Sequence, residues 1–241
     1  MLLKMRAYII RRLGSLIITL FLISIIIFLV MRVLPGDPAQ IIVGTEGSPE
    51  VLDRVREKLG LNRPLLIQYL DWLKGIFTGN LGQSFHYYLP VTTLTVSRLQ
   101  VTGPLAVLAI LVTVIFGIPL GIYAATHHNR LGDYGVMIFS QLGLSIPEFW
   151  LGILLILLFA VYARWFPAGG FTNWSDEPFK AFKSLLLPAL ALGIVRAAII
   201  ARLTRSSLLE VLGEDYVRTA RSKGLAERTI IYKHALRNGL I

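Results

Sequence analysis

The sequence predicts an all-α protein that crosses a membrane several times. Of its 241 residues, 55% are hydrophobic and 16% are charged, whereas soluble domains average about 45–50% apolar and about 25% charged residues. Four apolar stretches are long enough to cross the hydrocarbon core of a bilayer, which takes roughly 20 residues of helix. They cover residues 13–31, 103–126, 134–162 and 185–203. We therefore expect a polytopic transmembrane helical bundle with about four spans in this sequence.

The first stretch is expected to stay in the protein as a span. Basic residues precede it, as in a secretory signal peptide, but its apolar part exceeds the roughly 7–15 residues of such a signal and no Ala-x-Ala cleavage site follows. The net charge of +10 could indicate a nucleic-acid partner. Because the basic residues flank hydrophobic stretches, the membrane explains them instead. The absence of cysteine excludes disulfides and thiolate metal sites.

The positions of the basic residues predict the orientation. Lysine and arginine next to a span are retained on the cytoplasmic side, and an even number of spans places both ends of the sequence on one side. We expect a cytoplasmic N-terminus, with residues 34–102 and 163–184 outside and a short turn at 127–130 inside. The basic residues concerned are Lys4, Arg6, Arg11 and Arg12 before the first span, and Arg205, Arg218, Arg221, Lys223, Arg228, Lys233 and Arg237 after the fourth.

These expectations divide the sequence into four parts. The N-terminal flank with the first span is followed by an extracytoplasmic helical segment, a transmembrane core of three spans and a cytoplasmic loop. Their ranges are 1–33, 34–102, 103–204 and 205–241.

The extracytoplasmic segment contains two predicted helices. Ser48 is expected to cap the first, which has Pro49 at its opening position and ends at Gly60. Apolar residues at helical spacing predict the second at residues 64–77, on the membrane surface or against the bundle.

Apart from Arg202 near the inner end of the fourth span, two charged residues lie inside predicted spans, where charge is costly and usually marks a pathway or a buried partner. Glu148 follows Pro147 in the third span, and Arg196 lies within the fourth. Glu148 could line a pathway, or it could lie at a kinked helix and reach water or a backbone amide. For Arg196 a packing role is at least as well supported as contact with an anionic substrate. His127 and His128 are expected to be solvated in their turn.

The sequence contains no motif that predicts an enzyme. It lacks the Gly-x-x-x-x-Gly-Lys-Ser/Thr phosphate loop, so any ATP hydrolysis must belong to another subunit. Residues 143–147 break the Gly-x-Ser-x-Gly pattern at its last position, and His-Glu-x-x-His does not occur. We therefore expect no catalytic residue, cofactor site or metal site in this chain. A membrane enzyme of unrecognised chemistry and a passive channel or scaffold stay open as alternatives.

A charged amphipathic segment follows the fourth span. Its leucine, tyrosine and alanine residues recur every four positions and could face a partner or the rest of the protein, and Gly224 would permit a sharp turn at the helix end. A basic surface helix on anionic lipid is the alternative. The recurring residues are Leu208, Leu212, Tyr216 and Ala220.

Short fragments along nearly the whole chain match one family. The most specific is Glu214-Asp215-Tyr216-Val217-Arg218-Thr219-Ala220, with Gly224-Leu225 after it. The others are Arg11-Arg12, Leu34-Pro35-Gly36-Asp37-Pro38-Ala39, Leu59-Gly60-Leu61-Asn62-Arg63-Pro64 with Gln68-Tyr69, Gly79-Asn80-Leu81-Gly82-Gln83-Ser84, Gly117-Ile118-Pro119-Leu120-Gly121 and Leu144-Ser145-Ile146-Pro147-Glu148-Phe149-Trp150-Leu151-Gly152. In this order they resemble the B-type inner-membrane permeases of ATP-binding-cassette (ABC) importers for dipeptides, oligopeptides and nickel. Of the importers' general Glu-Ala-Ala-x-x-x-Gly motif, only Ala220 and Gly224 are kept.

The resemblance implies a permease subunit of an ATP-driven importer in the cytoplasmic (inner) membrane of a bacterium or archaeon. The subunit would form half of the pathway for short peptides or, as a second choice, for nickel or another small solute. Its implied partners are a second homologous permease, two ATPase subunits that bind the ATP, an extracytoplasmic substrate-binding protein and membrane lipid. The residues expected to couple to the ATPase are Glu214, Asp215, Tyr216, Val217, Arg218, Thr219, Ala220, Gly224 and Leu225.

The resemblance also predicts about six spans, two of them after the coupling loop, whereas the sequence ends at Ile241. We therefore expect a fragment, the ordered part of a longer chain or a truncated product. Such a fragment could insert into a membrane but is not expected to transport by itself, because part of the pathway would be unlined.

Overall fold

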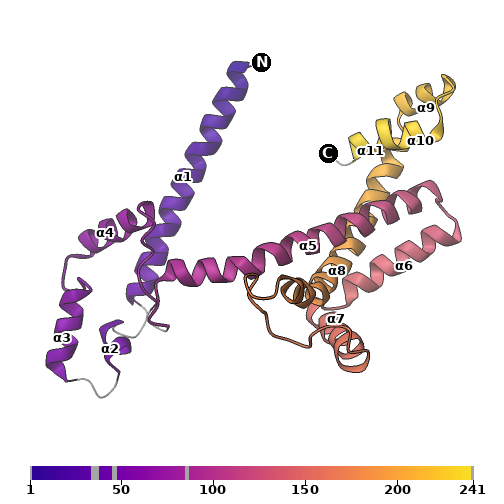
Figure 1. The fold of residues 1–241 in the computed structure, drawn as a ribbon. Coiled ribbons are helices and arrows are strands. Elements are labelled where there is room, and N and C mark those ends of the chain that lie inside the picture. Colours follow the sequence, from indigo (N-terminus) through magenta and orange to yellow (C-terminus); the bar gives the residue numbers. More distant parts are fainter. Residues whose placement is uncertain (1, 34–37, 45–47, 85–86, 240–241) are drawn as a thin grey trace. The chain divides into compact units, whose positions relative to one another are not determined.

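The computed structural model describes residues 2–33, 38–44, 48–84 and 87–239. They form helices and connecting loops in two compact units, Met1–Ser97 and Arg98–Ile241. Figure 1 labels the helices of both units.

The first unit contains a long helix followed by three short ones. Residue Gly60 after the third helix has φ +66°, a left-handed conformation that glycine adopts without a side-chain clash. The predicted end of this helix is therefore confirmed. Ser48 also occupies the predicted N-cap position with Pro49 after it, but its side chain makes no capping hydrogen bond. Residues 34–37, between the first two helices, lie outside the described residues. The helices are α1 (Leu2–Val33), α2 (Pro38–Val43), α3 (Pro49–Lys58) and α4 (Leu65–Phe77).

Aromatic side chains join α4 to the second half of α1. The Tyr69 ring packs edge-on against Phe21 and Phe28, with ring centroids 6.4 and 5.4 Å apart. Its hydroxyl lies 2.7 Å from the Ser24 hydroxyl, and the Trp72 ring lies 6.0 Å from Phe28. The prediction that residues 64–77 form a helix is confirmed, and this helix packs on the first span.

The second unit is built around one long helix, α8 (Pro178–Leu212). α5 (Val91–Thr126) enters this unit from the first, and α6 (Leu131–Ser145) packs along α8 (Figure 1). The remaining elements are α7 (Glu148–Leu155), the π-helix η1 (Ile156–Tyr162), α9 (Asp215–Ser222), α10 (Glu227–Thr229), the π-helix η2 (Ile230–Ala235) and α11 (Leu236–Gly239).

Three of the four predicted spans lie within long apolar helices. Of the residues that the structure describes, the stretches long and apolar enough to cross a membrane are Met5–Met31, Val91–Thr126 and Pro178–Leu212. They contain the spans predicted at 13–31, 103–126 and 185–203.

The span predicted at residues 134–162 is not one straight helix. α6 and the continuous pair α7–η1 are bent by 101° at a short break, so that together they count as one broken span or a re-entrant loop. Ile146 at the break is extended, with φ −92° and ψ 120°. The cause is Pro147, because proline lacks the amide donor for a continuing helix and disfavours helical backbone in the residue before it.

Small residues allow α5 and α6 to approach α8 closely. A Cβ atom on Gly121 of α5 would lie 2.6 Å from the Ala201 carbonyl oxygen, and one on Gly193 of α8 would lie 2.5 Å from Val112. Ala198 of α8 faces Gly143 of α6 in the same way. Such small residues are typical of helix contacts in membranes, where close packing replaces the hydrophobic effect.

Candidate coupling site

The predicted coupling segment forms a short helix that begins directly after α8. α8 ends at Leu212, and Glu214 with φ −68° and ψ 148° starts α9 as its N-cap. The Val217 and Ala220 side chains are buried against Ile230, with Val211 and Leu212 of α8 packed beside them. One face of α9 is thus held by α8 and by the segment that follows.

The opposite face of α9 is open to solvent. Asp215, Arg218 and Thr219 are exposed, as is Tyr216, whose hydroxyl accepts a hydrogen bond from Asn238 Nδ2 at 2.8 Å. This face carries both charges and an aromatic ring, so it can offer polar and apolar contacts to a partner.

The four-residue repeat of the sequence does not form one continuous stripe. Leu208 and Ala220 are buried, whereas Tyr216 is exposed. The reason is that the helix stops after Leu212 and restarts at Asp215, which rotates the second half of the pattern.

A glycine turn and an ion pair close the segment after α9. Gly224 has φ +75°, and its amide donates to the Arg221 carbonyl at 2.9 Å. The Arg221 guanidinium binds Glu227 through two hydrogen bonds, at 2.7 and 3.2 Å. These hydrogen bonds lower the pKa of the Glu227 carboxyl and raise the pKa of Arg221. The predicted turn at Gly224 is confirmed.

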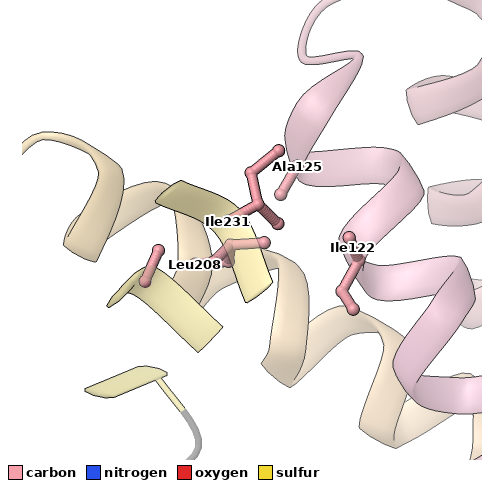
Figure 2. Close-up of a cluster of buried hydrophobic side chains, with 5 residues drawn as sticks. Ile122, Ala125, Leu208 and Ile231 are labelled. Atoms are coloured by element: carbon pink, nitrogen blue, oxygen red, sulfur yellow. The ribbon is translucent and has the colours of Figure 1, made fainter. Parts of the chain in front are cut away.

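A cluster of buried apolar side chains connects this loop to α5. Ile122 and Ala125 of α5 meet Leu208 of α8 and Ile231 of η2, as Figure 2 shows, and Ala235 of η2 completes the cluster. Ile230 belongs to the packing under α9, so neighbouring residues of one chain segment touch α9 and α5. A displacement of α9 would therefore displace side chains that pack on both α5 and α8.

A buried ion pair fixes α6 to α8 near the same end of these helices. Arg205 donates to both carboxylate oxygens of Asp133, through Nε to Oδ1 and through Nη2 to Oδ2 at 2.7 Å. The backbone amide of Asn129 donates to Oδ2 at 3.0 Å, and His128 Nδ1 lies 3.2 Å from the same oxygen. Asp133 is only 2% exposed. The sequence did not predict this pair, because the basic flank of the fourth span already accounts for Arg205.

The expectation that His127 and His128 are solvated holds in part, because His128 is exposed but both rings also contact other side chains. His128 also lies 3.1 Å from Arg205 Nη2, and the His127 ring stacks on Tyr123 with centroids 4.4 Å apart. Within the described residues, no group of three or more His, Asp or Glu side chains could hold a metal ion.

The two charged residues singled out inside the spans meet each other. Arg196 Nη2 of α8 lies 2.9 Å from Glu148 Oε1 in the first turn of α7. Both side chains keep substantial exposure, 62% for Arg196 and 32% for Glu148. The pair joins α8 to the helix that follows the break at Pro147.

Comparison with known proteins places this arrangement in one family. The model of binding-protein-dependent transport system inner membrane components matches residues 117–241, and the model of the N-terminal region of such membrane components matches residues 5–106. The chain belongs to this family. The permease resemblance predicted from the sequence fragments is thereby confirmed.

Individual relatives are named as transport permeases. A Brucella suis protein with the working name peptide transport system permease protein is 43% identical over 237 residues, which cover 98% of this chain and 76% of the relative. A Sinorhizobium fredii protein named as a probable peptide ABC transporter permease is 40% identical, over 97% of this chain and 75% of its own length. The glutathione transport system permease protein of Escherichia coli K12 is 41% identical, over 97% of this chain and 74% of its own length.

Family membership establishes the general role of the chain. It is a multi-pass inner-membrane permease subunit of a transport system that works with a substrate-binding protein. The all-helical fold with three to four candidate spans agrees with this role.

Proposed function

We propose that this permease forms half of the translocation pathway of an ATP-driven importer for short peptides. The relatives named for peptide transport support the substrate class. The relative named for glutathione transport supports another small solute as the second candidate substrate, beside nickel. The complete transporter would contain a second homologous permease, two ATPase subunits that bind the ATP, and an extracytoplasmic binding protein.

The N-terminus and the segment of residues 205–241 would face the cytoplasm. Basic residues precede α1 and follow α8, and basic residues next to a span are retained on the cytoplasmic side. Residues 34–102 would lie on the outer side of the membrane, with α4 against its outer leaflet, and α9 would be within reach of cytoplasmic ATPase subunits.

The observation that carries the coupling role is the two-sided environment of α9. Its exposed face, with Asp215, Tyr216 and Arg218, would dock on an ATPase subunit, while Val217 and Ala220 hold it to α8 and Ile230. A helix clamped in this way moves as a rigid body when its partner moves, which is how a domain closure reaches distant elements. Thr219, Gly224 and Leu225 would complete the docking surface and its turn.

Glu148 and Arg196 would line the pathway. Charged groups within spans usually face a water-filled cavity or one another, and this pair does keep exposure while paired. Its position beside the break at Pro147 would let the pair open when α7 moves relative to α8.

Ala220→Leu in the assembled transporter tests the coupling role. Ala220 is buried against Ile230, and inserting extra methylenes into a packed site costs about 1–3 kcal/mol and displaces neighbours. We expect peptide uptake to be lost while membrane insertion is normal and ATP hydrolysis continues without stimulation by the binding protein. Uptake of a radiolabelled dipeptide and ATPase activity would be measured in proteoliposomes. Ala226→Leu, at an exposed position, is the matched control.

Gly224 offers a second test that depends on backbone conformation. A Cβ atom there would meet nothing within 4 Å, so only the positive φ restricts substitution. Proline cannot adopt this φ, whereas asparagine tolerates it. Gly224→Pro should abolish uptake and Gly224→Asn should preserve most of it. Normal uptake by both Ala220→Leu and Gly224→Pro would overturn the coupling assignment.

A further inference from the structure

The contacts between α4 and α1 determine how deep α4 lies. Seven residues separate Ser24 from Met31, where the membrane-crossing stretch of α1 ends, which corresponds to about 10 Å at 1.5 Å per residue. Phe21 lies deeper still, near the middle of a hydrocarbon core that is roughly 30 Å thick. Tyr69 touches both residues, so part of α4 lies below the membrane surface.

The hydrogen bond between Ser24 and Tyr69 fits this depth. Hydroxyl groups inside a bilayer cannot bond to water and therefore need partners within the protein. Each of these two hydroxyls has the other at 2.7 Å, and Tyr69 is buried.

α4 has three distinct faces. Tyr69 and Trp72 turn toward α1. Asp71 and Lys74 form a polar face, which also carries the exposed Ile67, and Asp71 pairs with Arg63 at 3.2 Å. The third face is apolar and largely exposed, and it consists of Leu66, Leu70, Leu73 and Phe77, of which Phe77 is 82% exposed.

We propose that α4 is embedded in the membrane leaflet that holds the C-terminal half of α1, with this third face against lipid acyl chains. The helix on which α4 packs is itself apolar and exposed along this stretch, at Leu20, Ile23 and Ile27, and belongs to a membrane span. The polar face lies to one side of it, as in helices that sink about 5–10 Å into the boundary between headgroups and acyl chains. Trp72 suits the same depth, since tryptophan is enriched at membrane interfaces.

This inference does not rest on the proposed substrate or coupling role, since it requires only that α1 crosses a membrane. It assigns α4 a lipid contact rather than a contact with a second protein. The lipid would hold the loop that carries α3 close to the membrane surface.

Spin labels on single cysteines test the proposal, and the chain has no cysteine of its own. The full chain would be labelled in lipid nanodiscs at Leu66, Leu70 or Phe77, with Asp71 and Lys74 as positions on the polar face and Ile23 of α1 as a lipid-exposed reference. Collision rates with oxygen, which concentrates in lipid, and with a water-soluble nickel chelate would be measured by power saturation.

We expect a several-fold higher ratio of oxygen to chelate collisions at Leu70 and Phe77 than at Asp71 and Lys74, close to the ratio at Ile23. Equal access of the chelate to both faces would show that α4 lies in water and would overturn the proposal. Protection of Leu70 and Phe77 from both reagents would show a protein partner and would overturn it as well. Leu66 provides a second apolar position if one substitution disturbs folding.

Discussion

Two arginines of α8 bind carboxylates in very different surroundings. Arg205 binds Asp133 with two hydrogen bonds, and Asn129 and His128 surround the same carboxylate, which is almost completely buried. Arg196 meets Glu148 through one contact of 2.9 Å, and both side chains are partly exposed. One helix thus carries a closed ion pair beside the coupling segment and an open one beside the break at Pro147.

The difference indicates different roles. A buried charge that loses its partner is strongly unfavourable, so the Asp133–Arg205 pair holds α6, α8 and the adjoining turn in one arrangement. An exposed pair costs little to separate, because water can replace each partner. If the Glu148–Arg196 pair lines the pathway as proposed, it would open at little cost while the Asp133–Arg205 pair stays closed.

Asp133→Ala is expected to have the largest effect on stability. It leaves the Arg205 guanidinium without its carboxylate in a closed site, and the loss of one partner of a buried pair costs about 3–5 kcal/mol. Thermal unfolding of the purified protein in detergent would measure the change. Arg130→Gln is the matched control, because Arg130 is exposed in the same turn. If both variants unfold at the same temperature, Asp133 does not hold α6 to α8.

The closed pair could not be predicted from the sequence. Asp133 and Arg205 are 72 residues apart, and each has a simpler local explanation, at a helix start and at a basic membrane flank. The spans were predictable because long apolar runs have few alternatives. Which residues of α9 are buried could not be predicted in the same way, since the interruption between Leu212 and Asp215 depends on how α9 packs on Ile230. The break at Pro147 was predicted only as a kink, because its angle depends on packing against α8.

Glu148→Gln and Arg196→Gln are expected to change stability by less than about 1 kcal/mol each, as for exposed pairs. Peptide uptake should nevertheless fall several-fold, because the pair lies in the proposed pathway. The comparison would use the same unfolding assay together with dipeptide uptake by the assembled transporter. A stability loss of about 2.5–3.5 kcal/mol for an unpaired charge would place the pair in lipid instead of water. Unchanged uptake would remove Glu148 and Arg196 from the pathway.

A third arginine–carboxylate pair, Arg221–Glu227, lies in the proposed coupling loop beyond α8 and should have the smallest effect. Arg221 lowers the pKa of Glu227 in the folded protein, so the pair stabilises the fold above the unfolded pKa of about 4.3. This contribution is lost as the pH falls through the lower folded pKa. Both side chains are about half exposed, which limits the contribution to less than about 1 kcal/mol. Glu227→Gln should therefore lower the unfolding temperature slightly at pH 7, and the difference from the unsubstituted protein should vanish on acidification. A difference that persists at low pH would show that the glutamate stabilises the loop through packing rather than through its charge.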